Sequence, residues 1–261
     1  MATSDNLPQP AGSGNPLLRL WRELLTAVQF LTRIPVPRYA FAPEMIFAAA
    51  KFYPIVGAVV AVGAIVVEQL LRGHLPQQVV MLGVMIYLVA VTGGFHEDGL
   101  ADTCDAMGGW TRERRLEIMR DSRIGSYGTL AIVLSLLVRW QLLAAMPREN
   151  FAAYLLAAHA LCRWTVVPLS LALPPARTDG LGAQLASKLS LATVIVSTLL
   201  ASAIAGAALG AGAIAPVVAV CGVTALTALF YRAKLGGISG DCLGATNQLS
   251  EIAVYVCGVW M

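Results

Sequence analysis

The chain alternates long apolar stretches with short polar connections. A helix needs about 20 apolar residues to cross a bilayer, and segments of this character recur from residue 52 to the C-terminus. They cover residues 52–71, 77–95, 127–146, 151–173, 189–209 and 213–231, with a less apolar segment at 243–261. The pattern predicts an all-α fold, a polytopic membrane helix bundle with about six to seven transmembrane helices.

The N-terminal region has a different pattern. Residues 1–16 are polar and rich in Gly, Pro, Ser and Asn, which predicts a disordered tail before a single membrane domain at 17–261. After this tail, Arg19 and Arg22 recur at helical spacing, with Trp21 and other apolar residues largely opposite. This spacing predicts an N-terminal amphipathic helix that lies along the bilayer surface.

Composition and charge agree with a membrane protein. The chain is 57% hydrophobic and 13% charged, whereas soluble domains contain about 25% charged residues. Most of the 18 Lys and Arg residues fall on the side of the N-terminal segment, while Arg72 and Arg148 lie on the other side. The positive-inside rule therefore predicts a cytoplasmic N-terminus, with the polar segments 96–126 and 232–242 on the same face.

Asp98, Asp102 and Asp105 form an acidic cluster with i, i+4, i+7 spacing. At 100° per residue they fall within an arc of about 60° on one helical face. Such carboxylates repel one another and take up protons unless a cation lies among them. Oxygen ligands suit Mg²⁺ or Mn²⁺, and magnesium leaves coordination positions for substrate phosphates. The spacing favours a metal-bound diphosphate over the alternative, a solvated helix end.

Arginines follow the acidic cluster. An interfacial helix with i, i+3 and i, i+4 ion pairs accounts for part of this segment. Arg123 stands beside Asp121 and a glycine-containing turn, and a guanidinium binds phosphate oxygens bidentately. Arg123 is therefore the leading candidate for a phosphate clamp, with Arg120 and Arg114 behind it.

Three further ionisable residues have a structural and a functional interpretation. Asp241 stands where a helix N-cap is expected, so it is either a cap or a ligand. Glu251 lies two to three turns into an apolar helix, where ionisable residues are functional candidates. His96 either orients a carboxylate and accepts a proton or is structural.

The five cysteines form no C-x-x-C pair, which disfavours a disulfide framework and a zinc site.

Several motifs occur in a fixed order along the chain. They are FLTRIPVP at 30–37, FYPIVG at 52–57, GGFHEDGLADTCDA at 93–106, LEIMRDSRIG at 116–125 and GDCLGA at 240–245. With these motifs the chain resembles the cobalamin synthase family, the adenosylcobinamide-GDP ribazoletransferases, from about residue 20 to the end.

The resemblance implies a multi-pass enzyme of the bacterial inner membrane in cobalamin biosynthesis. It would transfer phosphocobinamide from adenosylcobinamide-GDP to α-ribazole or its 5′-phosphate, supported by magnesium, and release GMP. The lipid bilayer and other corrinoid-assembly enzymes are candidate partners, no nucleic-acid partner is expected, and the oligomeric state is open. Gln248 departs from the family pattern, which often has an acid at this position.

The residue pattern and the resemblance together give a candidate site. Asp98 and Asp102 are the principal expected metal ligands, and Asp105 or Asp121 is expected to accept the proton of the attacking hydroxyl. The resemblance also marks Arg123 as an active-site position, and Arg33 is a plausible substrate contact. The complete expected metal set is Asp98, Asp102, Asp105, Asp241 and Glu251; the other expected site residues are His96, Asp121, Arg33, Arg114, Arg120 and Arg123.

Two rival functions carry different expectations. A CDP-alcohol phosphatidyltransferase meets the same demand for a metal and a diphosphate, but Asp102 departs from its D-G-x-x-A-R pattern. An ion-coupled transporter would carry its carboxylates near the middle of the membrane on broken helices, often in repeated halves. Here the polar residues gather at one face and no repeat is evident.

Overall fold

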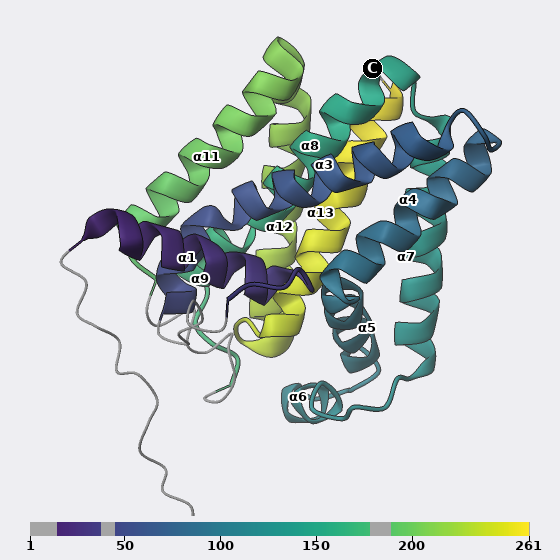
Figure 1. Ribbon diagram of the computed structural model, residues 1–261. Helices are drawn as coiled ribbons and strands as arrows, with labels where there is room; N and C mark the ends of the chain where they lie inside the picture. The colour runs from purple at the N-terminus through teal and green to yellow at the C-terminus, as the bar shows by residue number, and fades with distance from the viewer. Residues whose placement is uncertain (1–14, 38–44, 178–188, 261) are drawn as a thin grey trace, which may run out of the picture.

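The computed structural model describes residues 15–37, 45–177 and 189–260, and within them the chain is a bundle of helices (Figure 1). One isolated β-bridge joins Pro175 to Ile238. The predicted disordered tail falls almost entirely outside the described residues. The helices are α1 (Pro16–Leu31), α2 (Ile46–Ala49), α3 (Tyr53–Leu71), α4 (Gln77–Thr92), α5 (Phe95–Ala106), α6 (Arg112–Ile118), α7 (Ser126–Ala145), α8 (Arg148–Trp164), α9 (Val166–Ala172), α11 (Leu191–Leu209), α12 (Ile214–Leu235) and α13 (Gly240–Trp260), with short 3₁₀ turns η3 (Ala50–Phe52) and η4 (Gly210–Ala213).

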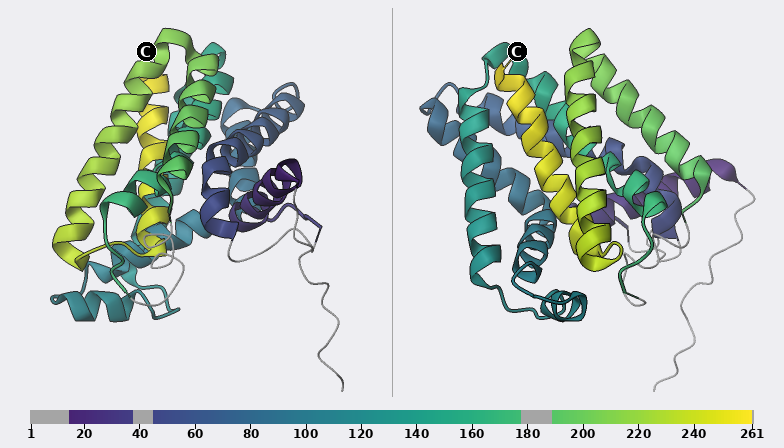
Figure 2. Two further views of the ribbon diagram at one scale, coloured as in Figure 1. Left: turned by 90° about the vertical axis from the view of Figure 1, so that its left-hand side faces the viewer. Right: turned by 180° about the vertical axis from the view of Figure 1, so that it is seen from behind.

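The all-α membrane fold is confirmed, although the count of spanning helices differs from the expectation. Four helical stretches of the described chain are long and apolar enough to cross a membrane: Ile46–Leu71, Ser126–Ala145, Arg148–Ala172 and Leu191–Leu235. The last one contains both α11 and α12, which run as two legs joined by η4 (Figure 2). The bent pair α4 and α5 passes the same test only as a unit.

The break between α4 and α5 lies at two glycines. Gly93 and Gly94 both have positive φ, near 70°, a backbone conformation that favours glycine. The two helices bend by 85° across this break. A Cβ atom on Gly93 would meet the guanidinium of Arg33. The break ends the apolar helix and starts α5, the helix that carries the acidic cluster, in a new direction.

Helices α5 and α13 approach each other closely at a pair of glycines. A Cβ atom added to Gly99 would lie 2.9 Å from the carbonyl oxygen of Asp241, and one added to Gly244 would lie 3.3 Å from the Cα atom of Gly99. Small residues allow two helix backbones to approach at such a contact. The contact places the acidic face of α5 beside the first turn of α13.

The predicted amphipathic helix forms as α1. Its buried side contains Glu23, whose carboxylate pairs with Lys51 at 2.7 Å and with Arg19 at 3.1 Å. Leu17 and Trp21 are exposed on the outer side. The pair with Lys51 therefore links α1 to η3 at the start of the bundle, and its apolar residues Leu17 and Trp21 face outward, as expected for a helix at a bilayer surface.

The polar elements gather at one end of the bundle. Helices α5 and α6, the first turns of α7 and α13 and the C-terminal end of α12 lie together there (Figures 1 and 2). The turn between α3 and α4 and the start of α8, next to Arg72 and Arg148, lie at the other end. The division of charge between two faces that the sequence predicts is thus present in the fold.

Candidate functional site

Four carboxylates from two helices meet at the polar end. Asp98, Asp102 and Asp105 lie along α5, and Asp241 lies in the first turn of α13. Helix α5 is not one of the four spanning stretches. Burial first, and then the negative charges of Asp241, Asp98 and Asp105, raise the pKa of Asp102 to about 7. A bound cation would relieve this repulsion.

The donor set suits a divalent cation of the magnesium type, since it consists of carboxylate oxygens. Within the described chain, no three of these aspartates place one oxygen each within 4.8 Å of the others. Magnesium is usually held by one or two carboxylates, with water and substrate phosphates completing its shell. The arrangement therefore fits an ion shared between pairs of these aspartates and a phosphorylated substrate, but not an all-protein cage.

Asp105 has defined partners at the start of α7. Its two carboxylate oxygens accept hydrogen bonds from the backbone N–H groups of Gly125, at 2.7 Å, and Gly128, at 2.8 Å. A negative charge at a helix N-terminus is favourable, because the first N–H groups of the helix have no internal partners. A Cβ atom on either glycine would strike the Asp105 carboxylate. Asp105 thus joins the acidic helix to α7.

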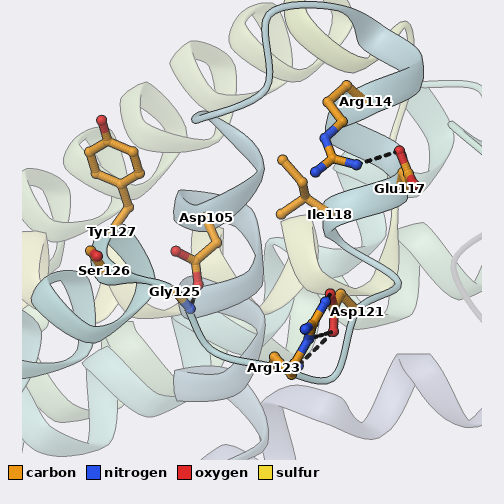
Figure 3. Close-up of a pocket in the computed structure, with 9 residues that line it drawn as sticks. All are labelled: Asp105, Arg114, Glu117, Ile118, Asp121, Arg123, Gly125, Ser126 and Tyr127. Carbon is orange, nitrogen blue, oxygen red and sulfur yellow. Dashed lines mark hydrogen bonds and ion pairs between the residues drawn. The ribbon is translucent and has the colours of Figure 1, made fainter.

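A cavity of about 570 Å³ opens next to Asp105 (Figure 3). Two ion pairs line it: Arg123 with Asp121 at 2.6 Å, and Arg114 with Glu117 at 2.7 Å. Hydrogen bonds from Arg123 lower the pKa of Asp121 to about 2. Asp121 is therefore an anion at neutral pH and a weak proton acceptor. The lining residues are Asp105, Arg114, Glu117, Ile118, Asp121, Arg123, Gly125, Ser126 and Tyr127.

A second polar group lies inside the bundle. The guanidinium of Arg139 on α7 donates to Glu97 at 2.9 Å and to Glu251 at 3.3 Å. The amide of Gln248 donates to Glu97 at 3.3 Å and accepts from Ser135 at 3.2 Å. Arg139 and the two glutamates are buried. This buried network joins α5, α7 and α13.

Glu251 belongs to the buried network, away from the other expected ligands. It follows Asp241 by ten residues of helix, which corresponds to about 15 Å along the axis. It also lies close to His159 and Cys162, each of which has one candidate ligand atom within 4.8 Å of its carboxylate. The guanidinium of Arg163 contacts His159 at 2.9 Å, so a positive charge already occupies this group.

The other expected site residues lie in three places: the start of α5, the cavity and the segment that follows α6. His96 is buried with its ring against Phe95, and Arg33 lies over the α4–α5 break at Gly93. Arg120 is exposed near the end of α6 and does not line the cavity. The structure thus brings together the four aspartates and places Arg114, Asp121 and Arg123 around Asp105.

One residue at the site has no signal in the sequence. Arg177 donates to Asp241 at 2.8 Å and places a positive charge beside the acidic cluster. In the sequence it is one of many basic residues on the face predicted to be cytoplasmic, with no motif around it. Only its contact with Asp241 in the folded structure identifies it as a residue of the site.

Comparisons with known proteins identify the family of the chain. A family model described as cobalamin-5-phosphate synthase matches residues 23–259. A protein of Leptothrix cholodnii is 41% identical over 92% of this chain and 96% of its own length. One of Ralstonia nicotianae is 38% identical over 92% and 95%, and one of Shewanella piezotolerans is 34% identical over 92% and 96%. All three are named adenosylcobinamide-GDP ribazoletransferase. No solved structure matches the chain. The matched family model spans nearly the whole chain, which therefore belongs to the cobalamin-5-phosphate synthase family.

Proposed function

We propose that this protein is an adenosylcobinamide-GDP ribazoletransferase of cobalamin biosynthesis and that the acidic cluster of α5 and α13 is its diphosphate site. The observation that carries the assignment of the site is the meeting of Asp98, Asp102, Asp105 and Asp241 at one end of the bundle, where the pKa of Asp102 is raised to about 7. Family membership and the names of the relatives support the reaction itself. They favour it over a phosphatidyltransferase or a transporter.

The metal is part of the proposal. Asp98 and Asp102 of α5 and Asp241 of α13 would hold Mg²⁺ or Mn²⁺, which when bound neutralises the diphosphate and stabilises the charge that develops on the transferred phosphate. Arg123 and Arg114 line the cavity together with Asp105. Their guanidinium groups are suited to bind the phosphate of the departing GMP. Glu251 supports the site from inside the bundle through Arg139 and is not assigned as a ligand.

The chemistry is a substitution at phosphorus. A hydroxyl group of α-ribazole, or of its 5′-phosphate, attacks the phosphate attached to cobinamide, and the bond from this phosphorus to the oxygen of GMP breaks. The hydroxyl proton passes to a carboxylate of the protein. Asp105 and Asp121 both line the cavity, but Asp105 also neighbours Asp102 of the expected metal site, and we assign it as the acceptor for that reason. Asp121 is held as a weakly basic anion by Arg123.

The orientation follows from the distribution of charge. The arginines of α6 lie at the same end of the bundle as the acidic cluster, and basic residues gather on the cytoplasmic side of inner-membrane proteins. The site would thus open to the cytoplasm, with its spanning helices in the lipid of the bacterial inner membrane. Both soluble substrates and the released GMP would exchange with the cytoplasm.

A direct assay tests the proposal. Purified protein in detergent receives adenosylcobinamide-GDP, α-ribazole and Mg²⁺, and the release of GMP and the formation of the corrinoid product are followed together. We expect both products in equal amounts and neither in the presence of excess EDTA. Absence of GMP release from well-folded wild-type protein would refute the reaction, whereas release that persists in EDTA would refute the metal requirement. A transporter would show activity only in sealed vesicles.

A further inference from the structure

The backbone just before Arg177 is fixed against the backbone just before Asp241. The N–H group of Ala176 donates to the carbonyl of Ile238 at 2.8 Å, and the N–H group of Ile238 donates to the carbonyl of Pro174 at 2.9 Å. A Cβ atom on Gly237 would strike the carbonyl oxygen of Pro174. Two segments far apart in sequence are thus held side by side, which directs Arg177 toward Asp241.

Arg112 fixes this bridge from a third direction. Its guanidinium donates to the carbonyl of Ala176 at 2.9 Å and to the carbonyl of Leu235 at 2.7 Å. The second of these carbonyls belongs to the last turn of α12, where backbone acceptors have no partners within the helix. Arg112 therefore positions the bridge.

The pair between Arg177 and Asp241 is a defined contact beside the acidic cluster. The guanidinium lies 2.8 Å from the carboxylate, and the two side chains are 17% and 25% exposed. Ser239 donates to the same carboxylate oxygen at 3.3 Å. In a mobile surface pair, the entropy lost by the long side chains offsets most of the attraction. Here the backbone segments that precede Arg177 and Asp241 are already held together by hydrogen bonds.

We propose that Arg177 is a diphosphate-binding residue that pairs with Asp241 before substrate enters and moves to a phosphate oxygen when the metal-loaded diphosphate binds. The proposal rests on the proposed function. Arg177 and a divalent cation compete for one carboxylate, since each requires the oxygens of Asp241. A guanidinium released from Asp241 has two N–H groups for a phosphate that lies among the same aspartates.

This competition predicts that loss of the Arg177 charge changes two affinities in opposite directions. Removal of the Arg177 charge should strengthen the binding of a divalent cation to the protein without substrate, because a competing cation is lost, by about tenfold. The same change should weaken the binding of the diphosphate substrate, because charge-assisted hydrogen bonds are lost, by about 10- to 100-fold. An arginine that only stabilises the fold would not move the two affinities in opposite directions.

The test compares wild type with Arg177→Gln. Titration calorimetry with MnCl₂ on purified protein in detergent, without nucleotide, measures the cation affinity. Steady-state release of GMP, with adenosylcobinamide-GDP varied at saturating α-ribazole and then the reverse, measures the two KM values. We expect tighter Mn²⁺ binding, a higher KM for adenosylcobinamide-GDP and an unchanged KM for α-ribazole. Arg72→Gln, which removes an arginine paired with Glu68 at the C-terminal end of α3, is the matched control and should change none of these values.

Weaker or unchanged Mn²⁺ binding in Arg177→Gln, or an unchanged KM for adenosylcobinamide-GDP, would overturn the proposal. Arg177→Lys covers the case in which the glutamine variant does not fold. It keeps the charge but not the planar fork, so we expect Mn²⁺ affinity near that of wild type and a raised KM for the diphosphate; a wild-type KM would contradict the proposal. Wild-type GMP release tests the reaction, and the Mn²⁺ titration does not depend on it, so the two failures are distinguishable.

Discussion

The guanidinium of Arg139 lies 2.9 Å from the carboxylate of Glu97, with both side chains buried. The same guanidinium contacts Glu251 at 3.3 Å. Glu97 is on α5, next to Asp98, and Glu251 is on the helix that begins with Asp241. Arg139 therefore connects the two helices that supply the aspartates, from a point inside the bundle. Loss of its guanidinium should disturb the positions of both helices.

Arg139→Met should destabilise the protein strongly. Removal of one member of a buried ion pair leaves the other charge without a partner, at a cost of about 3–5 kcal/mol. Thermal unfolding in detergent, followed by circular dichroism, should show a much lower Tm, and Glu97→Gln in the same chain should recover part of the loss. Arg148→Met, at an exposed position, is the control. An Arg139→Met variant with the wild-type Tm would show that the pair does not stabilise the bundle.

Asp102→Asn should abolish GMP release, by at least about a hundredfold, while membrane insertion remains intact. It removes one of the expected metal ligands, and ligand loss of this kind impairs both metal binding and charge stabilisation. The measurements are the assay described above and the yield of protein in the membrane fraction. Near-normal activity with Mg²⁺ supplied would contradict the assignment of Asp102 as a ligand.

The raised pKa of Asp102 gives a pH dependence. An acid whose pKa is higher in the folded chain than its ordinary value of 3.8 binds a proton on folding, so without metal the stability contributed by this group falls as the pH rises from about 4 to about 7. Divalent cations bind the ionised carboxylate and release that proton, so Mn²⁺ affinity should rise between pH 6 and pH 8. Calorimetry in buffers of different ionisation enthalpy measures the proton release, which should disappear in Asp102→Asn. An equal release in both proteins would assign the proton to another group.

Gly99→Ala should reduce activity by about tenfold with modest loss of stability, about 1–3 kcal/mol. The added methyl group would lie 2.9 Å from the backbone oxygen of Asp241, so α5 and α13 must move apart and the aspartates with them. Gly206→Ala is the matched control, because a Cβ atom there has no neighbour within 4 Å. Equal activity of the two variants would show that close helix contact is not required.

Arg123→Ala should raise the KM for adenosylcobinamide-GDP by about tenfold, the cost of a lost charge-assisted hydrogen bond, and should leave the Mn²⁺ affinity almost unchanged. Arg123 lines the cavity but lies outside the acidic cluster. The result would separate it from Arg177, which is expected to change both values. A KM equal to that of wild type would remove Arg123 from the phosphate-binding set.

The sequence by itself determines the class of fold, the family and one face of the site. Apolar segments of sufficient length specify membrane helices because every backbone polar group in lipid must be satisfied within the segment. The spacing of Asp98, Asp102 and Asp105 specifies a shared face because helical periodicity depends on neighbouring residues alone. The places where these helices break are not local properties: the stretch Leu191–Leu235 forms two legs, and α4 and α5 bend by 85° at their break.

Tertiary structure decides which distant charges meet. Asp241 joins the acidic cluster because Gly99 and Gly244 allow α5 and α13 to approach, while Glu251, on the same helix, is directed to Arg139. Arg177 lies next to Asp241 because the backbone before it is hydrogen-bonded to Ile238, a contact that no sequence motif predicts. These partners depend on how helices pack across the bundle, and the energy of a buried charge depends on its partner, so their roles follow from the folded structure and not from the residue pattern.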